Sequence, residues 1–333
     1  MITVSPTIKQ PAYWQKELAK AITDPAELIK ALGLPKNLLH PAKLAAETFP
    51  LKVTRHFLNL IKYADVNDPL LKQILPIGAE KEKTANFSYD PVGDSESKIS
   101  TGLLQKYHGR ALMISTGACA VHCRYCFRKH YPYSEENVLR AWNETIQELQ
   151  KETSITEVIL SGGDPLSLSD LKLNKIVNDL RKIPHIKRLR IHTRLPIVLP
   201  ERITESFISL LVQSKFQVCI VLHCNHPKEL SNILKPYLSE LKRNEITLLN
   251  QAVLLRGVND SFEIQSELSE RLFEFGVLPY YLHLLDSVLG ASHFEVDKKF
   301  VKDLEKRMRE MLPGYLIPKI VKEITGAKFK IPQ

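Results

Sequence analysis

The sequence predicts an α/β fold: a partial (β/α)6 parallel barrel with an N-terminal helical extension and a short C-terminal segment. From about residue 110, apolar strand-like segments alternate strictly with amphipathic helix-like segments, which is typical of a parallel sheet covered by helices. The strand segments are apolar almost throughout, as expected when both faces of a sheet are buried. Six such units are fewer than the eight of a complete barrel, so an open barrel is expected. A doubly wound open sheet is the alternative.

The expected elements follow in a regular order. Residues 1–105 are expected to be helical and irregular: Asp24 and Pro25 begin a helix that Gly33 ends, and residues 76–101 form an extended connection. The barrel is expected within residues 106–290, with strands at 111–115, 157–161, 188–193, 217–223, 246–254 and 278–285. Helices are expected at 135–151, 168–182, 202–214, 228–243, 262–275 and 297–311. Residues 291–333 then hold the last helix and the C-terminal segment.

Composition and charge exclude several classes of protein. The chain carries 46 Lys and Arg against 37 Asp and Glu, a formal net charge of +9. A basic balance invites a nucleic-acid partner, but the basic residues lack the aromatic interleaving of a single-strand binder. No apolar run approaches the roughly 18 residues of a membrane helix, and the first residues lack the apolar core of a secretion signal. We therefore expect a soluble, cytoplasmic protein with no membrane partner.

Three of the five cysteines fall within eight residues, after the first expected strand: Cys119, Cys123 and Cys126. Structural zinc needs four ligands, so a zinc site would require His122 or His130 as the fourth, which remains an alternative. Three thiolates on one loop suit a [4Fe-4S] cluster whose fourth iron is open. The other two, Cys219 and Cys224, lie in a strand-like run and are expected to be small buried residues.

Polar residues collect at the carboxyl ends of the expected strands, where the chemistry of such barrels takes place. They are Ser161, Gly162, Gly163 and Asp164 after the second strand, then His192, Arg194, His223, Gln251 and Asp286. Solvent at a sheet edge accounts for one or two polar strand ends, but less well for five of six strands. A binding site is therefore expected there.

The spacing Cys-x3-Cys-x2-Cys, with Tyr125 just before the last cysteine, resembles the signature of the radical S-adenosylmethionine enzymes. The run SGGDP, residues 161–165, is similar to the glycine motif with which that superfamily holds the methionine amino group. The resemblance implies that S-adenosylmethionine chelates the open iron. An electron from the cluster then cleaves it to a 5′-deoxyadenosyl radical.

From Gly102 onward the chain resembles the lysine 2,3-aminomutase family, and most of all its short branch that makes (R)-β-lysine for elongation factor P. The strings that carry the resemblance are GLLQKYHGRAL, CAVHCRYCFRKHYPY, SGGDPL, PHIKRLRIHTRLPIVLP, LLNQAVLLRGVND, PYYLHLLD, GASHF and GYLIPK. It implies an isomerase that converts L-α-lysine to (R)-β-lysine through the 5′-deoxyadenosyl radical and an imine of pyridoxal 5′-phosphate. The implied partners are L-lysine, an electron donor such as flavodoxin or ferredoxin, elongation factor P with its lysine ligase, and further copies of the chain in a homo-oligomer.

The resemblance also implies roles for individual residues. Lys330 is the catalytic lysine that carries pyridoxal phosphate; Lys328 competes for this role, because the family's glycine run before the lysine reads TGAKF here. Residues implied for the phosphate of this cofactor are Lys106, Tyr107 and Arg110, with Gln251 nearby. Residues implied for S-adenosylmethionine are Ser161, Gly162, Gly163, Asp164, His223 and Gln251, with Arg194 as a further candidate. Residues implied for the substrate are Arg128 for its carboxylate, and Asp286 and Glu323 for its distal ammonium.

One feature of the longer family members is missing. Ser261 stands where they have a zinc-binding cysteine, and no cysteine follows Cys224, so we expect no zinc. Two other classes of function remain as alternatives. A radical S-adenosylmethionine enzyme acting on RNA or protein would leave Lys330, Asp286 and Glu323 without a role. A non-catalytic iron–sulfur protein that binds nucleic acid would leave the run SGGDP without a role.

Overall fold

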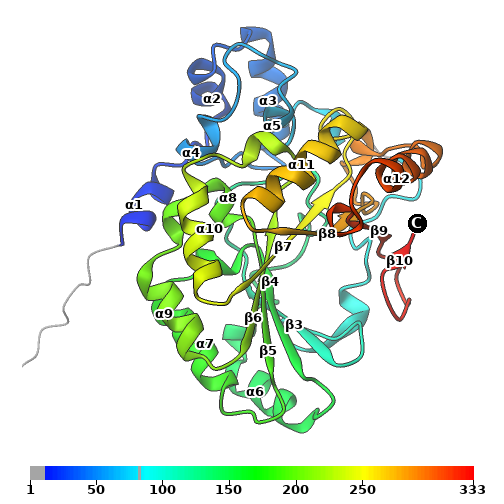
Figure 1. Cartoon of the computed structure of the whole chain (residues 1–333). Helices are drawn as coiled ribbons and strands as arrows, with labels where there is room; N and C mark the ends of the chain where they lie inside the picture. Colours follow the sequence, from blue (N-terminus) through cyan, green and yellow to red (C-terminus); the bar gives the residue numbers. More distant parts are fainter. Residues whose placement is uncertain (1–11, 82–83) are drawn as a thin grey trace, which may run out of the picture.

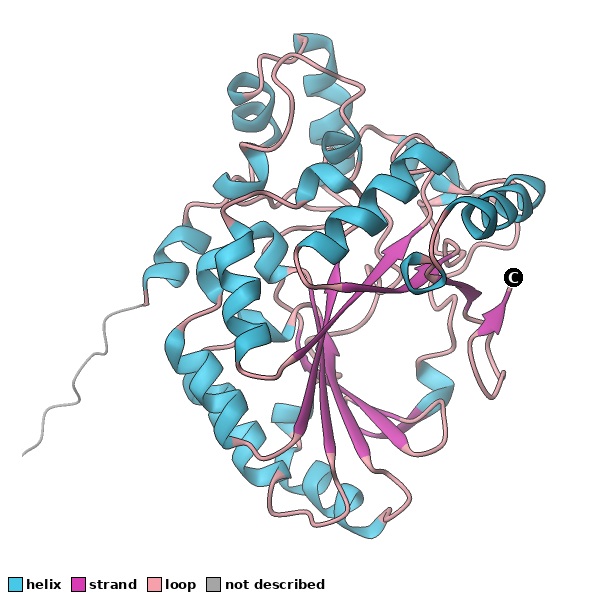
Figure 2. Cartoon of the chain, viewed as in Figure 1, coloured by secondary structure: helices cyan, strands magenta, loops and turns pink. Residues whose placement is uncertain are grey.

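A single sheet organises the molecule in the computed structural model, which describes residues 12–81 and 84–333. Its ten strands lie side by side in chain order (Figures 1 and 2). They are β1 (Lys98–Ser100), β2 (Leu103–Leu104), β3 (Arg110–Thr116), β4 (Glu157–Gly162), β5 (Arg188–Thr193), β6 (Gln217–His223), β7 (Thr247–Val253), β8 (Leu278–His283), β9 (Lys319–Lys322) and β10 (Ile331–Pro332).

Strands β3 to β8 are the six expected strands, and every neighbouring pair among them is parallel. Because these strands follow the chain order without a reversal, the doubly wound alternative, which needs a switch point, is wrong. Strands β1 and β10 lie at opposite edges of the sheet and do not pair with each other in the described chain. The expected open barrel is therefore confirmed.

Four strands were not expected from the sequence. Antiparallel β1 and β2 extend the sheet beside β3. At the other edge β9 pairs parallel with β8, and β10 pairs antiparallel with β9. These strands are two to four residues long, too short for the alternation of apolar residues that marks a strand. The sheet thus runs across the expected boundaries near residues 105 and 290, and the division into three regions remains a prediction.

Helices follow the parallel strands and lie outside the sheet (Figure 2). They are α6 (Trp142–Lys151), α7 (Asp170–Leu180), α9 (Glu205–Gln213), α10 (Leu234–Arg243), α11 (Phe262–Glu274) and α12 (Lys298–Met311), with a short α8 (Leu195–Val198) after β5. Hydroxyl side chains begin several of them: Ser169 caps α7, Thr204 caps α9 and Ser261 caps α11 by accepting a backbone N–H. Ser261 thus has a helix-capping role.

The N-terminal region is helical, as expected. Its helices are α1 (Tyr13–Ala19), α2 (Pro25–Ala31), α3 (Leu39–Ala46), α4 (Arg55–Leu58) and α5 (Pro69–Lys72). Asp24 caps α2 by accepting the N–H of Ala26 at 2.9 Å, with Pro25 at the first helical position. Buried Phe57 and Leu70 belong to the same apolar core as the barrel strands, so this region packs on the barrel.

Single 3₁₀ turns complete the description: η1 (Lys36–Leu38), η2 (Ala79–Lys81), η3 (Ser95–Ser97), η4 (Val138–Arg140), η5 (Pro165–Ser167), η6 (Pro200–Arg202), η7 (Pro227–Glu229), η8 (Ser292–Phe294) and η9 (Gly314–Leu316). Residues 76–101 were expected to be an extended connection; in the described part of this segment, η2, η3 and the short strand β1 interrupt it. Within the described residues, no helix has the length and apolarity needed to cross a membrane.

Candidate active site

The three clustered cysteines lie on the loop that leaves β3. The N-terminal region holds this loop in place: His122 donates its N–H to the carbonyl of Lys52, and Arg124 donates its N–H to the carbonyl of Gln73, both at 3.0 Å. The loop also closes on itself, because Cys126 N–H donates to the carbonyl of Cys123 at 3.0 Å. The loop is thus fixed between the barrel and helix α5.

Burial and the neighbouring thiols both raise the pKa values of Cys119 and Cys126. Burial, followed by the charge of Cys123, raises the pKa of Cys126 to about 11. Burial also raises the pKa of Cys119, with contributions from Asp164, Cys126 and Cys123. Thiols that perturb one another in this way share one neighbourhood. A metal bound there would release protons, because thiolates rather than thiols bind metals.

The donor set fits an iron–sulfur cluster, although the thiols do not yet converge. Among the described residues, no three His, Cys, Asp or Glu side chains stand together as a ready metal site, but three thiols on one loop are the ligand type and number that such a cluster uses. The zinc alternative gains no support, because the candidate histidines face backbone carbonyls. His122 Nδ1 lies 2.8 Å from Pro50 O, and His130 Nε2 lies 3.4 Å from Leu289 O.

The glycine motif at the end of β4 packs directly on the cysteine loop. A Cβ on Gly163 would lie 2.6 Å from the carbonyl oxygen of Ala118, and one on Gly162, whose φ is +122°, would lie 2.4 Å from that of Thr116. Gly163 N–H donates to the carbonyl of Thr116 at 2.7 Å. Only glycine permits this approach. The pair therefore brings the motif beside the thiols.

Asp164 joins the ends of two strands. Its Oδ1 accepts from Leu166 N–H (3.0 Å) and the Thr193 hydroxyl (2.7 Å), and its Oδ2 accepts from the N–H groups of Arg194 (2.8 Å) and Leu195 (2.9 Å). Four donors occupy a fully buried carboxylate. Asp164 thus fixes the loop after β4 to the end of β5, and any role toward S-adenosylmethionine runs through that loop.

His223 and Gln251 are direct neighbours on β6 and β7. The Nε2 atom of His223 lies 2.8 Å from the hydroxyl of Tyr125, on the cysteine loop, and the two rings stack. Burial lowers the pKa of His223 well below 6.5, so its imidazole is neutral at neutral pH. The two candidates therefore lie on the same side of the barrel opening as the cysteines.

The expected cofactor and substrate residues form one chain of alternating charges. Arg128 donates from Nε to Asp94 Oδ2 at 2.6 Å, and Asp94 Oδ1 lies 2.7 Å from Lys106 Nζ. Lys106 also reaches Glu323 Oε1 at 2.9 Å, and Glu323 Oε2 pairs with Lys330 Nζ. Opposite charges thus alternate from the cysteine loop to the C-terminal strand.

These contacts keep two carboxylates ionised in a buried place. Burial alone would raise the pKa of Asp94, but Arg128 and Lys106 outweigh it and hold the pKa at about 2. Burial likewise opposes the ionisation of Glu323, whose pKa Lys330 and Lys106 hold at about 2. Both carboxylates are therefore charged at neutral pH.

Asp286 behaves differently. Burial, followed by the charge of Glu323, raises its pKa to about 7. Its buried Oδ1 has no hydrogen-bond partner among the described residues. A buried carboxylate oxygen that receives no hydrogen bond destabilises the fold unless a ligand provides the donor. Asp286 therefore fits an added ammonium group.

Strands β9 and β10 bring Lys330 into the site. Ile331 pairs with Lys322 across these strands, which sets Lys330 against Glu323. The side chain of Lys330 is 21% exposed, whereas Lys328 is exposed and has no ion pair in the described part of the chain. Of the two candidates, only Lys330 is half-buried among the expected site residues.

Arg128, Tyr107 and Arg110 complete the expected set. Arg128 Nη1 donates to Ser161 Oγ at 3.1 Å, so the arginine contacts both Asp94 and the glycine motif. The Arg110 guanidinium lies 4.8 Å from the ring centre of Tyr107. Burial, with the charge of Glu323, raises the pKa of Tyr107, which keeps the phenol protonated.

The sequence reasoning missed Asp94, which contacts both Arg128 and Lys106. It lies just before η3, in the segment expected to be a plain connection, and no motif or periodicity distinguishes it there. It also missed Gln73 and Glu229, which are fully buried and contact Arg194. Buried polar residues of this kind leave no signal in a single sequence.

Comparison with known proteins identifies the family. Residues 113–227 match the model of the radical SAM superfamily. The chain is 41% identical to the L-lysine 2,3-aminomutase of Haemophilus influenzae over 96% of this chain and 95% of that protein, and 42% identical to that of Escherichia coli over 96% and 94%. It is 31% identical to the L-lysine 2,3-aminomutase of Clostridium subterminale over 96% of this chain and 77% of that protein. The chain therefore belongs to the lysine 2,3-aminomutase family of radical S-adenosylmethionine enzymes, and it is an isomerase.

Proposed function

We propose that this enzyme converts L-α-lysine to (R)-β-lysine with pyridoxal 5′-phosphate held on Lys330, besides the [4Fe-4S] cluster and S-adenosylmethionine that its superfamily implies. The observation that carries this proposal is the pairing of Glu323 with the ammonium of Lys330. A lysine side chain already lies on a buried carboxylate of the site. Asp286, whose Oδ1 has no hydrogen-bond partner in the described part of the chain, lies in the same electrostatic neighbourhood. The site thus has the chemistry to hold the ammonium end of a lysine.

When bound, the cluster with S-adenosylmethionine supplies an adenosyl radical, and pyridoxal phosphate supplies an aldehyde that takes up an amine. To hold this cofactor, Lys330 would have to give up its proton and leave Glu323, because only the neutral amine is a nucleophile. Glu323 is then free for the ammonium of the substrate, beside Asp286. Glu323 would thus exchange the lysine of the protein for the lysine of the substrate, and Asp286 would gain its first partner.

The cations of the site suit anionic ligands. Lys106 and Arg110 provide positive charge for a phosphate, and Tyr107 provides a hydroxyl. Asp94 Oδ2 accepts the hydrogen bond from Nε of Arg128, and Asp94 Oδ1 lies 3.4 Å from Nη2. A substrate carboxylate would therefore bind at the Nη1 and Nη2 edge, where it replaces the contact of Nη1 with Ser161. In this arrangement Asp94 orients the arginine and does not block it.

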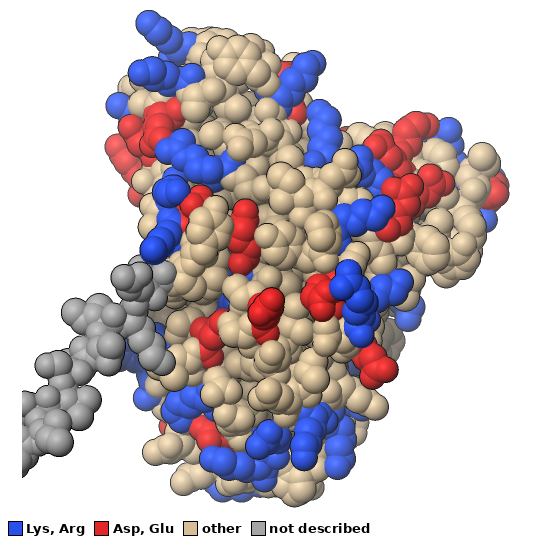
Figure 3. Space-filling view, turned by 60° about the vertical axis from the view of Figure 1, so that its left-hand side comes forward, with Lys and Arg blue, Asp and Glu red and all other residues tan. Residues whose placement is uncertain are grey.

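We further propose that the product serves the modification of elongation factor P by a lysine ligase, and that flavodoxin or ferredoxin delivers the electron. The near-complete coverage of the Haemophilus influenzae and Escherichia coli relatives supports assignment to the short branch. The alternative of an enzyme acting on RNA or protein gives Glu323 and Asp286 no ligand. On the face shown in Figure 3, acidic side chains also stand among the basic ones.

The test is anaerobic reconstitution with iron, sulfide and pyridoxal phosphate, followed by incubation with L-lysine, S-adenosylmethionine and dithionite. We expect (R)-β-lysine on a chiral column. The spectrum should combine a broad iron–sulfur band with a cofactor band that borohydride abolishes. A protein that holds all its cofactors but forms no β-lysine would contradict the proposal. Product that elongation factor P ligase does not use would contradict only the pathway assignment.

A further inference from the structure

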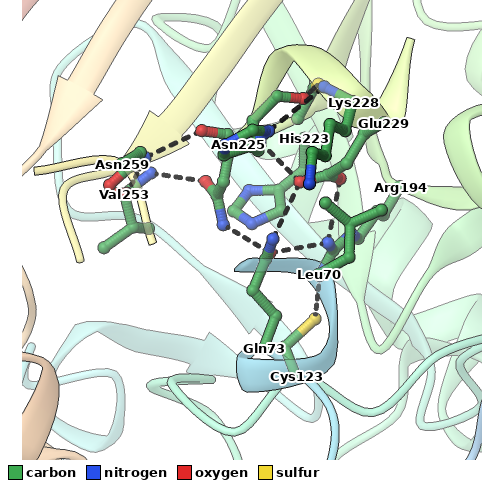
Figure 4. Close-up of polar contacts among 12 residues, drawn as sticks. Leu70, Gln73, Cys123, Arg194, His223, Asn225, Lys228, Glu229, Val253 and Asn259 are labelled. Carbon is green, nitrogen blue, oxygen red and sulfur yellow. Dashed lines mark hydrogen bonds and ion pairs between the residues drawn. The ribbon is translucent and has the colours of Figure 1, made fainter. Parts of the chain in front are cut away.

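A buried arginine contacts one of the three clustered thiols. Arg194, immediately after β5, donates from Nη1 to Cys123 Sγ at 2.8 Å (Figure 4). The same Nη1 donates to the hydroxyl of Tyr125 at 2.8 Å. The arginine side chain is 8% exposed. A guanidinium is thus fixed on the sulfur side of the cysteine loop, away from solvent.

A second set of contacts holds this guanidinium in place. Nη2 donates to Gln73 Oε1 at 2.8 Å and to Glu229 Oε2 at 2.9 Å. Gln73 Nε2 in turn donates to Glu229 Oε1 at 3.0 Å, and Asn225 N–H donates to the same oxygen at 3.1 Å. Figure 4 shows these side chains converging on Arg194 from helix α5 and from the segment after β6. Four protein acceptors therefore fix the plane of the guanidinium.

This occupancy argues against Arg194 as a ligand of S-adenosylmethionine. Both terminal nitrogens already have protein partners, and the remaining donor, Nε, is buried without one among the described residues. Glu229 is fully buried, so moving Arg194 toward a ligand would leave an unpaired buried carboxylate, which is strongly unfavourable. The arginine is positioned for the thiol.

We propose that Arg194 is a positioning residue that orients Cys123 and raises the reduction potential of the cluster, with Glu229 and Gln73 holding it. The proposal rests on the assignment of Cys123 as a cluster ligand. Reduction adds one electron from the donor and no proton, so the reduced cluster carries one more negative charge. A fixed cation and an N–H···S hydrogen bond stabilise that charge, and such contacts tune cluster potentials. Arg194 would thereby make the cluster easier to reduce by an electron donor that is a weak reductant.

Two variants test this. In Arg194→Lys, the single ammonium can pair with Glu229 but cannot also reach the thiol in the planar geometry of the fork. In the double variant Arg194→Met with Glu229→Gln, both charges of the pair disappear together, which avoids an unpaired buried charge. Arg202→Lys is the matched control: Arg202 is also fully buried, but it contacts Leu166 O at 2.7 Å and Asp170 at 2.9 Å, not a cysteine.

The readout is the midpoint potential of the reconstituted cluster without S-adenosylmethionine, from an electron paramagnetic resonance titration at equal iron content. We expect a shift to more negative potential in both Arg194 variants and no shift in Arg202→Lys. An unchanged midpoint in the variants, or weaker binding of S-adenosylmethionine as the sole effect, overturns the inference. If Arg194→Lys does not fold, the double variant decides. Absence of a cluster in the unmodified protein would instead refute the proposed cofactors.

Discussion

Replacing Asp286 with Asn should lower kcat/KM for lysine and should remove the pH dependence of kcat/KM near neutral pH. Asp286 has a pKa of about 7, so about a tenth of it is ionised at pH 6 and about nine tenths at pH 8. If only the ionised form binds the substrate ammonium, the apparent affinity for lysine falls about tenfold from pH 8 to pH 6. The other two site carboxylates have pKa values of about 2 and do not titrate in this range.

The expected decrease in kcat/KM follows from the contact that Asp286→Asn removes, a hydrogen bond from the substrate ammonium to a charged carboxylate. A hydrogen bond to a charged group contributes about 1.5–3 kcal/mol, which corresponds to about 12- to 140-fold at about 1.4 kcal/mol per tenfold. The assay is kcat/KM for β-lysine formation from pH 6 to 8, measured by chromatography for both proteins. We expect the gap between wild type and Asp286→Asn to narrow about tenfold at pH 6.

A stability measurement gives the control. A raised pKa means that folded Asp286 retains its proton where the unfolded chain has lost it. Ionisation therefore costs stability as pH rises from about 4 to about 7. Without ligand, Asp286→Asn should melt at a higher temperature than wild type at pH 8 and show no gain at pH 4. If lysine kinetics and their pH profile are the same in the variant, the ammonium site lies elsewhere.

Three further outcomes are expected. Cys126→Ala should lose most of its iron in elemental analysis and all turnover, whereas Cys224→Ala, at a buried position just after β6, should keep both; iron loss in Cys224→Ala would contradict the three-ligand assignment. Lys330→Ala should lose the borohydride-sensitive absorbance that Lys328→Ala keeps, and the reverse result would move the attachment site by two residues. Gly163→Ala should lose S-adenosylmethionine binding in equilibrium dialysis, because its Cβ would lie 2.6 Å from a backbone oxygen of the cysteine loop; unchanged binding would mean that the loop can shift freely.

The sequence predicts the barrel well because its strands are long and apolar. The expected strands at 188–193 and 217–223 coincide with β5 and β6, and the other four parallel strands differ from expectation by at most two residues at either end. The hairpin of β9 and β10 is different. It depends on the pairing of a few residues of β9 with β8, 38 residues earlier in the sequence (Lys319 with Tyr281), and no local pattern reports such contacts. The neighbourhood of Lys330 and Glu323 is a product of that hairpin.

The candidate site also combines features that a local sequence pattern predicts with features that depend on long-range contacts. The cysteine spacing and the glycine motif are local patterns, and the structure brings them together through close packing at Gly162 and Gly163. Asp94 became visible only in the fold, because its partners Arg128 and Lys106 are distant from each other in sequence. Their long-range pairing sets the charge of the site, and composition alone could not have indicated it.

The most direct test of the account uses L-lysine labelled with ¹⁵N at the α-amino group. The reconstituted enzyme, supplied with S-adenosylmethionine and a reductant, should form β-lysine that retains the label at the β-carbon. Omission of S-adenosylmethionine should abolish the product. Failure to form labelled β-lysine, in a preparation with full iron and pyridoxal phosphate content that still cleaves S-adenosylmethionine, would contradict the assignment as a lysine aminomutase.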